Sequence, residues 1–261
     1  MKLCDTHCHL DEQYFPGGSG AVLQRARAAG VGAFMVVGVG RTLEPARAAV
    51  ALAEAEPAAI AAAVGVHPHD ATTLTDAVEA ELRELGAREC VAAIGEIGLD
   101  YHYDHSPRDV QRSVFAKLVR LARDLKKPIV IHTREAPEDT LSILDGEGAR
   151  EVGGIIHCFS EDEKFARRAL ELGFDLSFSG IVTFKGAKDV AAVAASAPID
   201  RIHVETDSPY LAPVPMRGKP CEPAYVVHTA KRVAELRKTS LEELAPVLWK
   251  NAERRLRRTF S

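Results

Sequence analysis

The chain alternates between short runs of apolar residues and longer stretches in which apolar and polar residues mix with helical spacing. Many of the short runs are apolar at consecutive positions, which is typical of parallel strands that are buried on both faces. Eight strands are predicted on this basis, over residues 2–5, 33–37, 60–64, 91–94, 129–131, 154–156, 174–178 and 202–205.

The stretches between these runs predict helices that follow the strands. They cover residues 21–29, 45–55, 76–85, 108–125, 136–144, 162–172, 187–195, 225–236 and 241–258. Eight strands that alternate with helices over 261 residues predict an α/β fold of the (β/α)8 TIM-barrel type, with an open doubly wound sheet as the alternative. No glycine-rich linker or short repeat interrupts the pattern, so one domain is expected over residues 1–261.

Six polar side chains that can bind metal lie at the ends of predicted strands. His7 and His9 follow the first run, and both imidazoles aim at one point because residues two apart on a strand share a face. The other four follow the fourth, fifth, sixth and eighth runs: Glu96, His132, His157 and Asp207. The C-terminal ends of barrel strands form one mouth, so these six side chains are expected to meet there.

The number of candidate ligands indicates more than one metal ion. A catalytic metal typically has three protein ligands and an open position, whereas six ligands with one shared carboxylate suit two ions a few ångströms apart. We assign three ligands to one ion and two to the other: His7, His9 and Asp207, then His132 and His157. Glu96 is expected to bridge them. Imidazole and carboxylate ligands together permit zinc, magnesium or manganese, so two divalent ions are the expected cofactors.

Two carboxylates at the eighth strand are candidates for the chemical step. A metal-bound water can titrate near neutrality, and Asp207 is expected to face this water and to take its proton. Glu205 lies two residues earlier and therefore on the same face of the strand. Glu205 is expected either to act as the base or to orient a ligand, and the sequence leaves both roles open.

The net charge of −4 gives the protein no overall attraction for nucleic acid, so any contact with a polyanion must be local. Six residues that follow the third, fourth, fifth and eighth strands are candidates for substrate binding: His67, His69, Asp100, Tyr101, Arg134 and Arg217. Arginine can hold phosphates, and histidine or tyrosine can stack or donate hydrogen bonds. Lys185, Lys219 and the basic run 254–258 are instead expected to be solvated.

The five cysteines are odd in number and form no C-x-x-C pair, which fits free thiols in a reducing cytoplasm. Cys8 and Cys158 adjoin candidate ligands, but strand alternation is expected to turn them outward, where they pack as small hydrophobes. No apolar run approaches the length of a membrane span. A cytoplasmic location, no membrane contact and no obligate protein partner are therefore expected.

Six short motifs stand in order along the chain: THCHL at 6–10, GVHPH at 65–69, GEIGLDY at 95–101, PIVIHTR at 128–134, HCFS at 157–160 and ETDSPYL at 205–211. Together they resemble the successive signatures of the TatD family of metal-dependent deoxyribonucleases, which belongs to the amidohydrolase-type barrels. The resemblance runs from residue 5 to the segment 251–256, and so covers essentially the whole chain.

This resemblance implies a (β/α)8 barrel, a two-metal centre and phosphodiester hydrolysis, and it implies the same six residues as metal ligands. Two positions depart from the family pattern. Cys221 stands where asparagine is usual, and Glu161 stands where glycine is usual. Both belong to loops expected at the mouth, so the departures bear on substrate preference and not on the metal chemistry.

These features together predict a divalent-metal-dependent exonuclease whose substrate is single-stranded DNA or DNA ends. The alternative enzyme is a metal-dependent amide, ester or lactone hydrolase, including an aminoacyl-tRNA deacylase. The basic and histidine-rich rim disfavours it, and no obvious lysine follows the fourth or fifth strand to carry a carbamate bridge. A catalytically silent nucleic-acid-binding or scaffold protein is a third hypothesis, which the complete ligand set disfavours.

Overall fold

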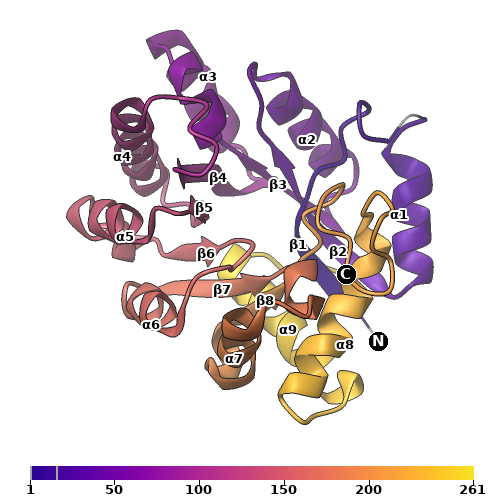
Figure 1. The fold of residues 1–261 in the computed structure, drawn as a ribbon. Coiled ribbons are helices and arrows are strands. Elements are labelled where there is room, and N and C mark those ends of the chain that lie inside the picture. Colours follow the sequence, from indigo (N-terminus) through magenta and orange to yellow (C-terminus); the bar gives the residue numbers. More distant parts are fainter. Residues whose placement is uncertain (1, 16) are drawn as a thin grey trace.

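The computed structural model describes residues 2–15 and 17–261, and within them eight parallel strands pair in chain order (Figure 1). The strands are β1 (Leu3–Cys8), β2 (Val31–Gly38), β3 (Ile60–Val64), β4 (Val91–Asp100), β5 (Ile129–Arg134), β6 (Gly154–Ile156), β7 (Phe174–Phe178) and β8 (Ile202–Val204). A parallel bridge between Cys8 and Ser208 joins the end of β1 to the segment after β8. The predicted (β/α)8 barrel is confirmed, because a doubly wound sheet would reverse its strand order.

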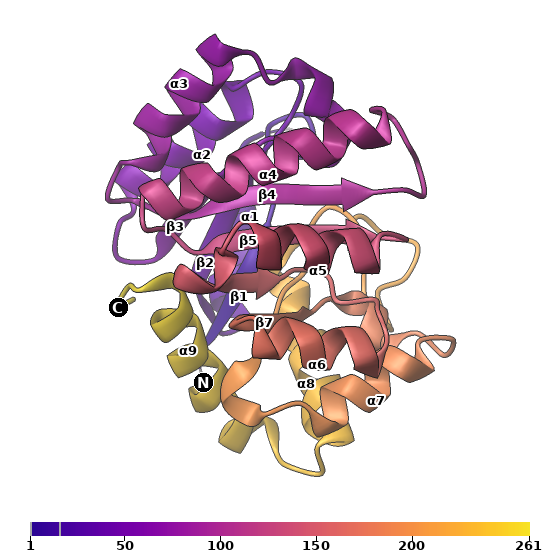
Figure 2. The same ribbon diagram turned by 90° about the vertical axis from the view of Figure 1, so that its left-hand side faces the viewer.

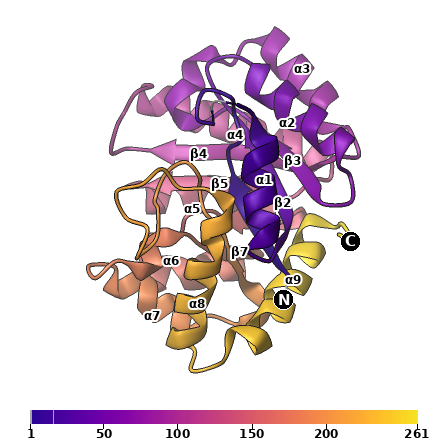
Figure 3. The ribbon, with the colours of Figure 1, turned by 90° about the vertical axis from the view of Figure 1, so that its right-hand side faces the viewer.

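Helices surround the barrel on its outside (Figures 2 and 3). They are α1 (Ser19–Ala28), α2 (Glu44–Ala55), α3 (Asp76–Gly86), α4 (Arg108–Asp124), α5 (Pro137–Gly146), α6 (Glu163–Glu171), α7 (Lys188–Ser196), α8 (Val226–Leu236) and α9 (Leu241–Leu256). Short 3-10 helices are η1 (Pro68–Thr73), η2 (Ala149–Glu151), η3 (Gly180–Thr183), η4 (Ile199–Arg201) and η5 (Pro223–Tyr225). Each predicted helix corresponds to one of the α-helices.

Three strands that carry candidate ligands extend further than the apolar runs that predicted them. β1 continues to Cys8, β4 to Asp100 and β5 to Arg134. The polar ends of these strands still belong to the sheet, since Gly98 pairs with His132 in the register of β4 and β5. A strand predicted from apolar residues alone is therefore too short where its last residues direct polar side chains at the mouth.

Alternate strand residues separate into two apolar layers. One cluster takes every second position of several strands together with residues of α9 and the C-terminal segment: Ala33, Met35, Val37, Ala61, Ala63, Ala93, Val130, Ile155, Ala252, Leu256 and Phe260. The intervening positions pack with the outer helices in a larger cluster. Alanines and larger apolar side chains together therefore fill the barrel interior, and α9 covers its N-terminal end (Figure 2).

The same end of the barrel holds an ion-pair cluster around Asp175, a fully buried residue of β7. Its carboxylate accepts hydrogen bonds from Arg201 (2.5 Å), Arg254 (2.8 Å) and Arg255 (2.9 Å), and His203 Nε2 lies 3.0 Å from Oδ2. The prediction of a solvated basic face at residues 254–258 is therefore only partly right, because Arg254 stays exposed but pairs with Asp175, whereas Arg255 is largely buried beside it. The last turn of α9 directs Arg254 and Arg255 at the buried start of β7, and η4 contributes Arg201.

The other two arginines of this run also have structural contacts. Arg257 and Arg258 donate to backbone carbonyls in neighbouring loops, among them those of Lys126 and Glu89. These hydrogen bonds tie the C-terminal segment to the loops that precede β4 and β5. Among the described residues, no helix combines the length and the apolar character that a membrane crossing requires.

Candidate metal centre

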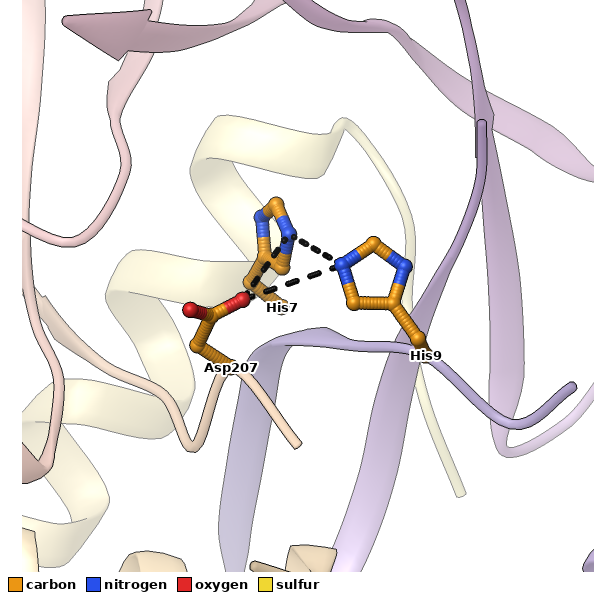
Figure 4. A group of neighbouring side chains, drawn as sticks. All are labelled: His7, His9 and Asp207. Atoms are coloured by element: carbon orange, nitrogen blue, oxygen red, sulfur yellow. Dashed lines mark hydrogen bonds and ion pairs between the residues drawn. The ribbon is translucent and has the colours of Figure 1, made fainter. Parts of the chain in front are cut away.

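The first ligand cluster joins the end of β1 to the segment after β8 (Figure 4). His7 Nε2 and His9 Nε2 lie 3.4 Å apart, and each lies 3.7 Å from Asp207 Oδ1. Two ligand atoms bound at about 2.0–2.1 Å to a tetrahedral zinc ion lie about 3.4 Å from each other. His9 Nδ1 lies 3.0 Å from Val37 O, so its proton donates to that carbonyl and Nε2 keeps its lone pair for the cluster.

The turn that carries Asp207 is held by buried polar contacts. Asp5 accepts hydrogen bonds from the backbone nitrogen and the hydroxyl of Thr206, at 2.9 and 2.6 Å. Asp207 N donates to His7 O at 2.9 Å, and Asp207 has a φ of 55°, which few residues other than glycine adopt. Such strained conformations persist where the surroundings hold them, and they cluster at functional sites. The turn thus aims the Asp207 carboxylate at the two histidines.

Glu96 on β4 lies between the two predicted sets of ligands. Its Oε2 is 3.4 Å from His7 Nε2, whereas its Oε1 is 2.9 Å from His132 Nδ1 and 3.1 Å from His157 Nε2. Gly98 lets β4 approach β5 this closely, because a Cβ atom there would lie 1.9 Å from His132 O. The two oxygens of one carboxylate therefore face two different groups of histidines.

Two further carboxylates hold the histidines from behind. Asp100 Oδ2 is 3.0 Å from His132 Nε2, and Glu205 Oε1 is 2.9 Å from His157 Nδ1. Glu205 Oε1 also accepts a hydrogen bond of 2.6 Å from Cys158 N. Carboxylates in this position fix the ring orientation of metal-binding histidines. The sequence predicts that Glu205 either acts as the base or orients a ligand, and its contacts match the second role.

Burial and neighbouring charges set the protonation of the cluster. Burial lowers the pKa of His7 and that of His67 to about 4, so both rings are neutral at pH 7. Burial opposes the charge on Glu96, but the combined effect of the neighbouring histidines, His157 first, holds its pKa well below the usual range. Burial also raises the pKa of Asp207 to about 6. A neutral imidazole and an ionised carboxylate are the forms that bind metal.

The residues present fit a divalent cation. Among the described residues, four groups of three side chains offer ligand atoms within 4.8 Å of one another. Three of these groups share His7, His157 or Asp207, and the fourth consists of His67, Glu96 and His132. Two buried atoms at this place, His7 Nδ1 and Glu205 Oε2, have no hydrogen-bond partner within the described part of the chain. Nitrogen and carboxylate donors in this arrangement suit zinc, manganese or magnesium.

His67 lies closer to the cluster than the sequence indicated. Its Nε2 is 3.3 Å from Glu96 Oε1, while its Nδ1 accepts a hydrogen bond of 3.1 Å from His69 N. In the neutral ring the proton therefore sits on Nε2 and donates to Glu96. This tautomer makes His67 a hydrogen-bond donor beside the metal centre.

Two predicted substrate-binding residues occupy other places. Asp100 belongs to β4 and not to the loop after it, and its buried carboxylate contacts His69 and His132, each at 3.0 Å. Tyr101 donates its hydroxyl proton to Asp139 of α5 at 2.6 Å. Consecutive strand residues face opposite ways, so an inward Asp100 requires an outward Tyr101. Asp100 thus orients histidines and Tyr101 bonds to α5, and the role of these two residues in substrate binding stays a prediction.

Arg134 and Arg217 are exposed cations, and each lies over an aromatic ring. The guanidinium carbon of Arg134 is 4.8 Å from the ring centre of Tyr103, and that of Arg217 is 4.1 Å from that of Phe184. Neither has a carboxylate partner in the described part of the chain. Sequence reasoning missed Tyr103 and Tyr210, although both are aromatic residues just after strands that carry ligands.

The two cysteines beside ligands differ from each other. Cys8 is buried among the residues that pack with the outer helices, as predicted. The same prediction is wrong for Cys158, which lies with His157 and Asp207 in one of the groups of potential ligands. Cys158 has a φ of 47°, so the alternation of the strand no longer applies after β6. Its Sγ is 3.3 Å from Ser179 Oγ.

The two departures from the family pattern lie in different surroundings. Cys221 is fully buried, and its Sγ is 3.9 Å from Thr206 O, so it packs against the turn that carries Asp207. Glu161 is half-buried, and burial raises its pKa to about 7. Cys221 therefore supports the ligand turn, whereas Glu161 stays partly accessible.

A family model described as TatD related DNase matches residues 4–257. YabD of Bacillus subtilis (strain 168), described as an uncharacterized metal-dependent hydrolase, is 44% identical over 255 residues, which cover 98% of this chain and 99% of that protein. YcfH of Escherichia coli (strain K12), described in the same words, is 42% identical over 257 residues, which cover 97% and 95%.

Among solved structures, that of YJJV, a TatD homolog from Escherichia coli K12, has a TM-score of 0.88 at 29% sequence identity and covers 96% of each chain. The family model and the bacterial relatives span nearly the whole length of the chain. This protein therefore belongs to the TatD family and is a metal-dependent hydrolase.

Proposed function

We propose that this protein is a two-metal phosphodiesterase that removes nucleotides from single-stranded DNA or from DNA ends. The observation that carries the proposal is the position of Glu96, whose Oε2 faces His7 at 3.4 Å while its Oε1 faces His132 and His157 at 2.9 and 3.1 Å. One ion would be held by three residues and the other by two, with Glu96 shared: His7, His9 and Asp207, then His132 and His157.

The chemistry of such a centre follows from the groups around it. A bound pair of divalent ions activates a water molecule and neutralises charge on the attacked phosphate. Asp207 is suited to take the proton of the water, since its Oδ1 lies 3.7 Å from the Nε2 atoms of both His7 and His9, beside the place where the water would be held. Glu205 and Asp100 act as positioning residues, because they orient His157 and His132 through the ring nitrogens away from Glu96.

The mouth also offers groups that suit an anionic substrate. Arg134 and Arg217 are exposed and can each contact a phosphate oxygen. The overall charge of −4 does not attract a polyanion at long range, so binding would depend on these local cations and on the metal centre. The description of the matching family model as a DNase supports DNA as the substrate.

The test combines metal analysis with three DNA substrates of equal composition. They are a linear single strand labelled at either end, a blunt duplex and a circular single strand. We expect stepwise shortening of the linear strand, little attack on the circle, and full dependence on zinc, manganese or magnesium. Cleavage of the circle at the rate of the linear strand would contradict exonuclease action. Hydrolysis of carboxylic esters without any cleavage of DNA would contradict phosphodiester chemistry.

A further inference from the structure

We propose that Tyr103 and Tyr210 are two base-stacking platforms, one on each side of the metal centre, which make the enzyme selective for unpaired DNA. The inference rests on the proposed function, because it specifies how the same site recognises the strand. Both residues are among the few large hydrophobic side chains that the described part of the protein exposes, at 51% and 49%.

Tyr103 stands in the turn after β4 and is surrounded by groups that suit a nucleotide. The ring of His105 is nearly parallel to it at 5.6 Å, and the ring of His69 meets it edge-on at 5.4 Å. The guanidinium carbon of Arg134 lies 4.8 Å from its ring centre. An arginine beside an aromatic ring can contact the phosphate of a nucleotide whose base stacks on the ring or on the guanidinium plane.

A continuous series of rings connects Tyr103 to the metal centre. His69 lies 4.3 Å from His67 between ring centres, and His67 Nε2 is 3.3 Å from Glu96 Oε1. His69 is also fixed by its contact with Asp100 at 3.0 Å. Tyr103 is therefore connected to Glu96 through the rings of His69 and His67, each in contact with the next.

Tyr210 occupies the corresponding place after β8. Its backbone nitrogen donates to Asp207 O at 2.8 Å, so the ring belongs to the turn that carries a ligand. Its ring meets those of His9 and Tyr14 at steep angles, with centres 6.4 and 5.8 Å apart, and its hydroxyl bonds to that of Tyr14 at 2.8 Å. These contacts fix the side chain, while about half of its surface stays open to a base.

The turns that carry the two platforms lie on opposite sides of the mouth. The strands follow one another around the barrel in chain order, so β4 and β8 lie on opposite sides of it. Both turns stand at the end of the barrel toward which the strands point (Figure 3). A strand that crosses the metal centre would thus place the bases on either side of the cleaved phosphate against Tyr103 and Tyr210. A duplex cannot do so, because its bases are already stacked and paired.

The experiment compares an ordinary single strand with a strand of the same length whose terminal two nucleotides lack bases. Alanine in place of Tyr103 or Tyr210 should raise KM for the ordinary strand about tenfold, because stacking on an aromatic side chain contributes that much or more per base. Neither substitution should alter KM for the abasic strand, and kcat should change little because stacking acts equally before and during the reaction. Tyr103→Phe and Tyr210→Phe should keep the wild-type KM for both strands, because phenylalanine retains the aromatic ring.

A second measurement does not require turnover. A single strand with 2-aminopurine at its two terminal positions, bound by the metal-loaded Asp207→Asn protein, should lose fluorescence through stacking. Tyr210→Ala or Tyr103→Ala should each reduce that loss. Ile199→Ala is the matched control, since Ile199 is 43% exposed in η4 at the opposite end of the barrel. It should leave KM and the fluorescence signal unchanged.

The outcomes separate this inference from the proposed function. Equal weakening of the ordinary and the abasic strand by the alanine variants, or wild-type behaviour toward both, overturns the platforms while DNA hydrolysis stands. Failure of the wild-type protein to cleave any DNA overturns the proposed function. The fluorescence titration then decides the platforms alone, and an unquenched base in the wild-type protein overturns them.

Discussion

The barrel contains two buried clusters, one at each end, and a carboxylate lies at the centre of each. The two clusters differ in the side chains that surround the carboxylate. At the N-terminal end, Asp175 binds three arginines and His203. At the mouth, the ion-pair partners of Glu96 among the described residues are four histidines: His7, His67, His132 and His157. Both carboxylates have a pKa below the usual range despite burial, so the charge of each is stabilised.

The difference lies in whether the surrounding groups can give up their protons. An arginine does not deprotonate in proteins, so the arginines around Asp175 stay charged and cannot bind a metal ion. This cluster therefore stabilises the fold. A histidine loses its proton near neutrality and then offers a lone pair, so the Glu96 cluster can exchange protons for metal ions. A buried carboxylate among histidines indicates a metal centre, whereas one among arginines indicates a structural ion pair.

The strongest test of this contrast is removal of metal. Chelation should abolish hydrolysis and leave the barrel folded, because the Asp175 cluster needs no ion. The unfolding temperature should fall by several degrees, since a ligand at about 100 times its Kd stabilises a protein by about 2.7 kcal/mol. Activity, elemental analysis and thermal unfolding measure this, and re-addition of zinc, manganese or magnesium is the control. Undiminished hydrolysis by protein shown to be metal-free would refute a metal centre.

Substitution of each carboxylate by its amide should sharpen the contrast. Glu96→Gln should bind fewer than two ions per chain and lose activity in proportion, because a shared carboxylate supplies charge to both sites and an amide supplies none. Asp175→Asn should bind as many ions as the wild type. Elemental analysis of both purified variants measures the occupancy. Two fully occupied ions in Glu96→Gln would show that Glu96 is not shared.

Asp207→Asn should act on the reaction more than on binding. We expect kcat to fall about 100- to 10,000-fold, the usual contribution of a general base, with little change in KM. Steady-state kinetics on a short single strand, with metal content measured in parallel, provides the comparison. An unchanged kcat with a raised KM would assign Asp207 to substrate binding instead.

Asp175→Asn should act on the fold and not on the reaction. Removing one partner of a buried ion pair leaves the other charges uncompensated and costs about 3–5 kcal/mol of the free energy of unfolding. Denaturant unfolding measures the loss, and Glu163→Gln is the control, because its exposed pair with Arg167 contributes at most about 1 kcal/mol. If both variants were equally stable, the Asp175 cluster would not hold the barrel together.

The smallest expected effect concerns how the stability of the metal-free protein depends on pH, since the two clusters should contribute in different pH ranges. Burial opposes the charge on His157, but Glu96 and Glu205 outweigh it and raise its pKa well above the usual value. Its stabilising contribution is therefore complete below about pH 6.5 and is lost as the pH rises through the raised pKa. The pKa of Asp175 is lowered, so that contribution is present above about pH 3.9 and is lost only in acid.

Unfolding temperatures measured from about pH 6 to pH 9 should consequently decline in the metal-free wild type, and decline less in His157→Gln. Asp175→Asn should keep the wild-type slope, since its cluster does not titrate in this range. Identical slopes in the wild type and His157→Gln would mean that the mouth cluster holds no proton in the metal-free protein.

Much of the fold and of the ligand set could be predicted from the sequence, because buried parallel strands and their polar ends leave a strong pattern. The pattern fails where the backbone departs from regular alternation. The register of β4 against β5 shifts between Ile94 and Ile97, which no residue pattern reports. Asp100 belongs to β4 because the strand continues beyond its apolar run, and the residue pattern does not report where the strand ends.

Other features depended on contacts between distant parts of the chain. Cys158 faces the site because its φ is positive, and that follows from its bond to Glu205, 47 residues away. The direction of Arg254 and Arg255 could not be inferred, because Asp175 lies 79 and 80 residues earlier. A run of basic residues at a helix end has the same appearance whether it meets water or a buried carboxylate.

Because the interior is filled and α9 covers the N-terminal end, substrate and product can reach or leave the metal centre only through the mouth. Apolar side chains occupy the inside of the barrel and α9 lies across its N-terminal end, so the mouth serves both as entrance and as exit. A polymer cannot thread through from one end to the other. Each released product has to leave by the path along which the next substrate arrives, and accumulated product will therefore compete with substrate for entry.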